Sequence, residues 1–271
     1  FSEWGIHPDE GDEWVRVAGI KLGIDGGFEG GWMREPYQAP WDGEEGFRGL
    51  QTVPTERYVS LVRALNGRGW RVATHAVGDA AIDLVLEAYE AAHGDSPIVG
   101  KRWVIEHAFV SQSDQLPRMK ALGLQLSVQD HLYVAAPSLR KYWGAERADG
   151  VTPIRTYLDS GLDVSLGTDS PVVPYPAMWA LYHFITRNTI SAGVAGAGQR
   201  IGREEALRLS SLGNANLTFE EDNKGSLEVG KIGDLVVLGD DPLSCAEDAI
   251  KDIPVLQTYL GGRRVYDSDG A

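Results

Sequence analysis

The chain of 271 residues contains 43% hydrophobic and 24% charged residues, the proportions of a folded globular protein. Its formal net charge of -14 argues against nucleic acid and anionic membrane surfaces as partners, because both attract basic proteins. One cysteine, Cys245, cannot form an internal disulfide, and no apolar run approaches the roughly 18 residues of a membrane span. These features predict a cytoplasmic protein whose partners are small molecules or other proteins.

Apolar and β-branched segments alternate with helical patterns along most of the chain. Five strands are predicted, at residues 15–25, 71–75, 102–107, 123–129 and 162–169. Helices are predicted at residues 55–69, 79–92, 113–123, 152–160 and 202–212, with a polar loop before the fourth of them. Thr55 and Asp79 are expected to cap the first two helices. This alternation is typical of βαβ units around a parallel sheet.

The pattern changes near Lys224, where short apolar segments begin to alternate with glycines. The segments G-D-L-V-V-L-G-D-D-P and V-L-Q-T-Y-L-G-G-R-R-V-Y predict short strands around turns. We therefore expect two domains, an α/β domain at residues 1–223 and a small β domain at residues 224–271. No Gly-x-Gly-x-x-Gly turn follows a strand, which disfavours a flavin or nicotinamide oxidoreductase.

Four polar residues stand on predicted strands where strand propensity does not explain them. Lys21 lies within the first strand, His75 ends the second, His107 ends the third and Asp169 ends the fifth. In a parallel α/β barrel such strand ends share one rim, where the active sites of that fold are found. Imidazoles and carboxylates in one place suit a divalent metal such as zinc, with manganese or iron as alternatives.

Each of these residues also has an ordinary structural explanation. A single histidine at a strand end is more often a hydrogen-bonded structural residue than a ligand. Asp169 precedes Ser170 and Pro171 and can equally open a turn, and Lys21 alone is typical of a surface residue. The four together on one predicted sheet favour a shared site.

A set of motifs, taken in order along the chain, extends this interpretation. K-L-G-I-D-G-G, T-H-A-V-G-D-A-A-I-D, V-I-E-H-A, S-V-Q-D-H and L-G-T-D-S-P-V together resemble the amidohydrolase superfamily, in particular amidohydrolase family 3 with its N-substituted formamide deformylase-like members. The tail G-S-L-E-V-G-K-I-G-D-L-V-V-L-G-D-D-P-L resembles that family's small β-sandwich. The resemblance implies a TIM-barrel-type α/β hydrolase, here a partial barrel of strands 4 to 8 followed by C-terminal strands of the sandwich.

The resemblance also implies roles for the four polar residues. His75 and His107 are similar to the metal ligands that end the fifth and sixth barrel strands, and Asp169 to the ligand and catalytic, proton-handling carboxylate of the eighth. Lys21 corresponds to the end of the fourth strand, where members carry a carboxylated lysine that bridges two metals. These roles imply one or two divalent ions, most simply zinc, and hydrolysis of a carbon–nitrogen bond in an amide or formamide by metal-activated water.

Two further residues are candidates for substrate contacts, each with an alternative. His131 follows Asp130, which stands where the family usually has proline, so a plain surface histidine is an equal alternative. Tyr37 is one of several aromatic residues that could line an apolar pocket, although core packing explains such residues equally well.

One departure from the family pattern concerns the first barrel strand. The family begins its metal site with a His-x-His pair, and none of the six histidines forms one. We therefore expect a chain that starts just before the fourth strand, as the C-terminal part of a larger enzyme. An unpaired first strand predicts a homo-oligomer. A non-catalytic oligomeric or partner-binding remnant of an amidohydrolase is the alternative to an active enzyme.

Overall fold

The computed structural model describes residues 5–39 and 43–270. It divides into two compact units. The first unit comprises residues 1–128 and 137–163, and the second comprises residues 129–136 and 164–271. The expected domain boundary after residue 223 stays a prediction.

Four strands of the first unit pair in parallel, in the order in which they follow along the chain. They are β1 (Ile20–Gly23), β2 (Val72–Ala76), β3 (Val104–His107) and β4 (Gln125–Gln129). All four were predicted from the sequence. The predicted first strand was too long, because the chain before β1 forms only an isolated antiparallel bridge between Gly11 and Arg16.

Helices follow the strands of the first unit in the expected alternation. They are α1 (Thr55–Gly67), α2 (Asp79–Asp95), α3 (Leu116–Ala121), α5 (Ala145–Asp149) and α6 (Ile154–Asp159). The expected capping roles of Thr55 and Asp79 were wrong. Pro54 and Gly78 occupy the two N-cap positions, and Thr55 and Asp79 are the first helical residues.

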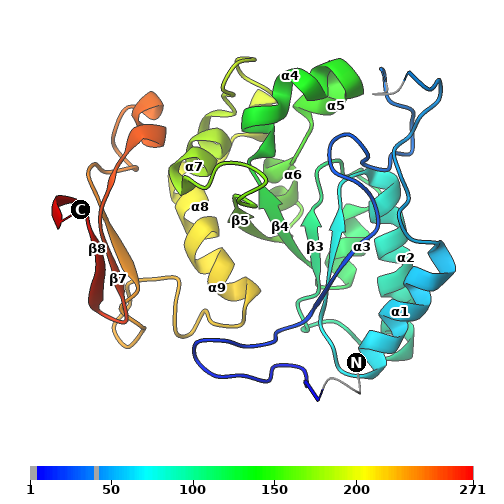
Figure 1. Cartoon of the computed structure of the whole chain (residues 1–271), viewed down its shortest axis with the longest axis horizontal. Coiled ribbons are helices and arrows are strands. Elements are labelled where there is room, and N and C mark those ends of the chain that lie inside the picture. The colour runs from blue at the N-terminus through cyan, green and yellow to red at the C-terminus, as the bar shows by residue number, and fades with distance from the viewer. Residues whose placement is uncertain (1–4, 40–42, 271) are drawn as a thin grey trace. The chain divides into compact units, whose positions relative to one another are not determined.

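The first unit is held together by apolar packing around a buried chain of hydroxyl groups. Helices α1 and α2 lie side by side (Figure 1) and bury residues such as Val62 and Ile82. Between them, the hydroxyl of Thr74 on β2 lies 2.7 Å from that of Tyr58 and 2.9 Å from that of Tyr89. These bonds satisfy polar atoms that would otherwise be costly to bury, and they fix β2 against both helices.

The second unit begins with β5 (Asp163–Gly167), the last of the five predicted strands. Its helices are α7 (Ala177–Thr186), α8 (Arg203–Arg208) and α9 (Asn214–Leu217), with a π-helix at Leu209–Gly213 and short 3-10 helices at Ala197–Gln199, Glu247–Asp252 and Ser268–Gly270. The predicted helix at 202–212 is confirmed as a continuous helical stretch through α8 and the π-helix.

Two helices contradict the sequence expectations. Helix α4 (His131–Trp143), which begins in the second unit and ends in the first, replaces the expected polar loop. It carries Pro137 in its interior, a residue that normally ends a helix. Helix α7 was missed because it is apolar and buried on almost every side, so it lacks an amphipathic pattern.

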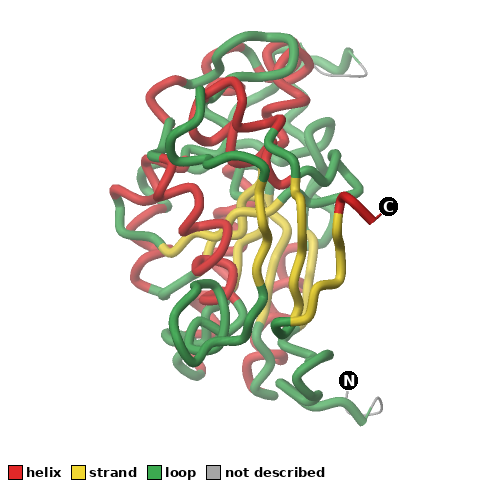
Figure 2. Tube along the Cα trace, turned by 90° about the vertical axis from the view of Figure 1, so that its left-hand side faces the viewer, coloured by secondary structure: helices red, strands yellow, loops and turns green. Residues whose placement is uncertain are grey.

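The C-terminal strands form a separate antiparallel sheet, as predicted. They are β6 (Leu235–Leu238), β7 (Val255–Leu260) and β8 (Arg263–Asp267), which Figure 2 shows side by side. Several of their aliphatic side chains are exposed, including Val236 and Val265. No helix in the described parts of the chain is long and apolar enough to cross a membrane.

Candidate active site

The two predicted imidazole ligands of the first unit lie together. The ring centroids of His75 on β2 and His107 on β3 are 4.5 Å apart in an edge-to-face arrangement. The strand register pairs His107 with Ala76, and side-chain alternation alone would therefore place the two imidazoles on opposite faces of the sheet. Left-handed backbone angles at His107 (φ 75°) and Ala108 (φ 49°) end the strand and turn the imidazole toward His75.

Lys21 lies on the strand next to His75. The register pairs Lys21 with Ala73 and Gly23 with His75, so Lys21 and His75 share one face and are separated by roughly 6 to 7 Å along the strands. Lys21 is exposed, and its ammonium makes no hydrogen bond or ion pair with any of the described residues. A side chain of this length can therefore reach the end of β2 without first breaking another contact.

A buried carboxylate that was not predicted as a site residue, Asp25, supports His75. The side chain of Asp25 is fully buried and accepts hydrogen bonds from the backbone N–H groups of Trp32, Val77 and Gly78 at 2.9–3.1 Å. Its Oδ1 lies 3.5 Å from Nε2 of His75. Burial raises the pKa of Asp25 to about 6, against the opposing effect of these amide groups and of His75.

The same contacts set the orientation of the His75 ring. Its Nε2 lies 3.1 Å from the carbonyl oxygen of Gly26. A carbonyl can only accept, so Nε2 carries the proton of this bond and the lone pair of the neutral ring remains on Nδ1. Histidine ligands of metals are commonly held in this way, by a carboxylate or carbonyl on the other ring nitrogen.

The glycine of the T-H-A-V-G-D motif has a steric explanation. A Cβ atom on Gly78 would lie 1.9 Å from the carbonyl oxygen of Trp32. The backbone N–H of Gly78 donates to Asp25 at 2.9 Å, and this contact requires the close approach of the two segments. Only glycine therefore allows the turn after β2 to close on Asp25.

Asp169, the remaining predicted metal ligand, lies in the second unit together with His131, which was predicted as a substrate contact. Nε2 of His131, the first residue of α4, lies 3.4 Å from Oδ2 of Asp169, which follows β5. The alternative of a surface histidine was wrong, because the His131 side chain is only 3% exposed. Asp169 also opens a turn, since its carbonyl accepts a hydrogen bond from Val172 at 2.9 Å. Asp169 therefore opens a turn with its backbone carbonyl and contacts His131 with its carboxylate at the same time.

Tyr37 packs inside the first unit. Its hydroxyl donates to the carbonyl oxygen of Gly31 at 2.7 Å, and burial raises its pKa above the usual range. Its ring lies edge-on to those of Phe47 and Trp143, with centroids 5.0 and 6.0 Å away. A direct substrate contact by Tyr37 stays a prediction.

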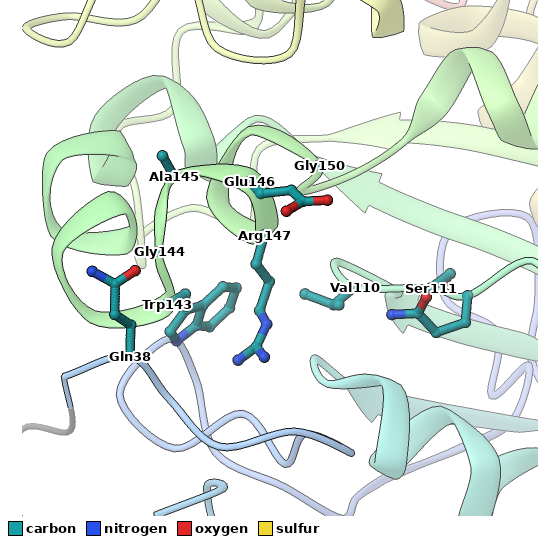
Figure 3. A pocket seen from close by; sticks show the side chains of 10 residues that line it. Gln38, Val110, Ser111, Trp143, Gly144, Ala145, Glu146, Arg147 and Gly150 are labelled. Carbon is teal, nitrogen blue, oxygen red and sulfur yellow. The ribbon is translucent and has the colours of Figure 1, made fainter.

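A pocket of about 490 Å³ in the first unit (Figure 3) is lined by loops, by the last residue of α4 and by α5. Its walls come from the segments that follow β1, β3 and β4 along the chain. The lining residues are Gln38, Val110, Ser111, Gln112, Trp143, Gly144, Ala145, Glu146, Arg147 and Gly150.

A series of aromatic contacts connects this pocket with the histidine pair. The ring of His107 lies 5.2 Å from that of Phe109, which stacks on Phe28 at 5.2 Å. Phe28 contacts Trp143 edge-on at 5.8 Å, and its carbonyl accepts the indole N–H of Trp143 at 3.0 Å. Trp143 of the pocket wall is thus connected to His107 through Phe28 and Phe109.

Two solved structures with a similar fold are described as uncharacterized metal-dependent hydrolases. An uncharacterized metal-dependent hydrolase from Pyrococcus furiosus is similar with a TM-score of 0.73 and 30% identity, over 90% of this chain and 48% of that one. One from Pyrococcus horikoshii OT3 gives a TM-score of 0.77 and 25% identity, over 91% and 49%. The fold class predicted from the sequence, that of the TIM-barrel-type hydrolases, is confirmed.

The sequence comparisons agree with the structural ones. A model of the amidohydrolase family matches residues 1–266. This chain therefore belongs to the amidohydrolase family, as the motifs predicted.

Two curated relatives are each 31% identical to this chain. The N-substituted formamide deformylase of Arthrobacter pascens matches over 205 residues, 75% of this chain and 38% of the relative. Protein LONG AFTER FAR-RED 3 of Arabidopsis thaliana matches over 262 residues, 94% of this chain and 44% of the relative. The chain thus spans less than half the length of these two relatives.

Proposed function

We propose that this chain carries part of the active site of a metal-dependent hydrolase that cleaves the carbon–nitrogen bond of an amide or formamide. The observation that carries the proposal is the contact between His75 and His107, whose rings meet 4.5 Å apart at the ends of two parallel strands. Membership of the amidohydrolase family and the similarity to a protein named N-substituted formamide deformylase support it.

The donor set fits a divalent ion, zinc most simply, with manganese or iron as alternatives. Two nitrogen ligands of one zinc ion each lie about 2.0–2.1 Å from it, which requires imidazoles as close as this pair. His75 offers Nδ1, because its Nε2 donates to Gly26. Lys21, in carboxylated form, would add oxygen ligands and allow a second ion. When bound, the ion would activate water near neutral pH and polarise the carbonyl under attack.

We assign the proton transfers to Asp169. Its carboxylate would accept a proton at Oδ2 from the attacking water and return it to the leaving nitrogen. His131, whose Nε2 lies 3.4 Å from that oxygen, would orient the carboxylate. By its resemblance to family members, Asp169 is also proposed as a metal ligand. The proposal includes a small-molecule substrate, a cytoplasmic location and a homo-oligomeric state.

Metal analysis tests the proposal. Purified protein, dialysed and analysed by mass spectrometry of its elements, should hold at least one zinc or similar ion per chain. The double variant His75→Ala plus His107→Ala should lose it, because both imidazoles of the pair are removed. The matched control is His93→Ala, on α2, which should keep the metal. Equal metal content in wild type and the double variant would contradict the proposal and favour a non-catalytic remnant.

A further inference from the structure

The pocket beside the aromatic residues lies close to the histidine pair along the chain. Val110 and Ser111, on its wall, follow His107 by three and four residues. Three extended residues span at most about 10 to 11 Å, so the wall begins within the length of a small substrate from the imidazole. Loops that follow the strands of this fold form its substrate sites, and a volume of 490 Å³ suits a small molecule.

One end of the pocket carries a positive charge without an acidic partner. Arg147 donates to the carbonyl oxygen of Pro36 at 3.2 Å, and no carboxylate among the described residues lies within ion-pair distance of it. Several other arginines of this acidic chain pair with carboxylates, as Arg63 does with Asp95 at 2.6 Å. The guanidinium of Arg147 therefore keeps donors for a ligand.

The other groups around Arg147 provide a neutral donor and an apolar surface. The exposed amide of Gln38 makes no hydrogen bond with the described residues and borders the same end of the pocket. Trp143, 3% exposed, uses its indole N–H on Phe28 and presents only its ring to the cavity. The carboxylate of the acidic Glu146 lies on the side away from the guanidinium of Arg147 (Figure 3).

We infer that this pocket binds the carboxylate of the substrate through Arg147 and Gln38, with an apolar group against Trp143, so that the preferred substrates are small amides that carry a carboxylate. A planar carboxylate matches the fork of a guanidinium, and Glu146 at the opposite end opposes the reversed orientation. The inference rests on the proposed function, because the pocket belongs to the same group of strand-end loops as the histidine pair.

Calorimetric binding to the metal-free protein tests this inference independently of turnover. The probes are N-benzoylglycine, which carries a carboxylate, and N-benzoylglycinamide, its neutral counterpart. We expect the carboxylate probe to bind at least about tenfold more tightly, since a charged hydrogen bond to a guanidinium contributes roughly 1.5–3 kcal/mol. The variant Arg147→Gln should lose this preference, Arg147→Lys should retain part of it, and Arg63→Gln, on an exposed ion pair of α1, should retain all of it.

The outcomes separate this inference from the proposed function. Equal affinity for both probes, no binding of either probe, or an unchanged preference in Arg147→Gln would overturn the carboxylate site even if the protein holds its metal. A clear preference that depends on Arg147 would establish the site even if metal analysis failed. Unchanged circular dichroism of Arg147→Gln and the partial recovery in Arg147→Lys distinguish loss of the site from loss of the fold.

Discussion

Nε2 of His75 lies 3.5 Å from Oδ1 of Asp25, and that carboxylate is completely buried. Asp25 accepts the backbone N–H of Trp32, seven residues further along the chain, and those of Val77 and Gly78, which lie 52 and 53 residues away. It therefore holds the segment after β1 and the turn after β2 in one arrangement. The orientation of the His75 ring depends on this arrangement, because the acceptor of its Nε2 proton is the carbonyl of Gly26, the next residue.

Replacing Asp25 by asparagine should weaken metal binding. Both carboxylate oxygens accept backbone N–H groups, so an amide NH₂ would place a donor against donors and displace the loop that holds His75. We expect Asp25→Asn to lower metal affinity roughly 10- to 100-fold, the usual effect of losing a group that orients a ligand. Competition with a chelator measures the affinity. Asp95→Asn, on an exposed carboxylate, should leave it unchanged, and an equal affinity in Asp25→Asn would rule out the positioning role.

Strand ends were predictable from the sequence because they depend on local patterns. The β-branched run before His75 and the apolar run before His107 both stop at a polar residue. A change of this kind within a few neighbouring residues is enough to predict the end of a strand. Asp25 could not be assigned in the same way, because its partners Trp32, Val77 and Gly78 meet it only in the folded state. The one local sign of its role was that Asp25 is a polar residue between the apolar Ile24 and two glycines.

Other features of the structure depend on tertiary packing, which a local sequence pattern does not show. The positive φ at His107, which turns its ring toward His75, is a property of the folded backbone and not of the apolar alternation. Helix α4 tolerates Pro137, and α7 is buried almost all round, so neither shows the period of a surface helix. Local propensity failed where tertiary packing determined the structure.

Carboxylation of Lys21 should make metal uptake depend on bicarbonate. The neutral amine of Lys21 would add carbon dioxide and release a proton, and the carbamate oxygens would then join the ligands of the ion. Uptake of zinc by metal-free protein should rise when bicarbonate is added, and Lys21→Ala should abolish that rise. Lys120→Ala, which removes a lysine that bonds the carbonyl of Ser160, is the control and should behave as wild type. An experimental map with a plain ammonium at Lys21 facing an occupied metal would refute the carboxylation.

The substitution Gly78→Ala should destabilise the first unit. The added methyl group would lie 1.9 Å from the carbonyl oxygen of Trp32, so the turn after β2 must move and lose its bond to Asp25. We expect a loss of about 1–3 kcal/mol in the free energy of unfolding, as for other overpacked sites. Gly94→Ala in α2 meets nothing within 4 Å and should stabilise the protein by up to about 1 kcal/mol. Urea denaturation of both variants would show whether the steric argument is correct, and equal stabilities would disprove it.

Self-association is expected from the surfaces of both units. Strand β1 pairs only with β2 among the described strands, and the β6–β8 sheet exposes aliphatic residues such as Val236, Leu260 and Val265. Because the net charge of -14 opposes association, moderate salt should favour it by screening. Light scattering should therefore find a dimer or larger species, with more of it at moderate than at low salt. A 29.5 kDa monomer at both salt concentrations would refute this prediction.

The buried His183 should make stability depend on pH. It lies in α7, its Nδ1 donates to the carbonyl of Asn188 at 2.9 Å, and its Nε2 has no hydrogen-bond partner among the described residues. Burial, aided by the charge of Arg187, lowers its pKa from 6.5 to about 3. The unfolded chain therefore binds a proton first as the pH falls, and the folded state loses stability below pH 6.5. Between pH 7 and pH 5 this loss amounts to about 2 kcal/mol.

Comparing a variant with wild type isolates that contribution. Burial raises the pKa values of Asp25 and Asp130 to about 6 and about 7, so these carboxyls change stability in the opposite direction within the same range. In His183→Gln, the difference between the unfolding free energies at pH 7 and pH 5 should shift by about 2 kcal/mol relative to wild type, because the titrating group is gone. His7→Gln, on an exposed histidine, should show no such shift. Parallel pH profiles for wild type and His183→Gln in urea denaturation would mean that the pKa of His183 is the same in the folded and unfolded chain, which contradicts the effect of its burial.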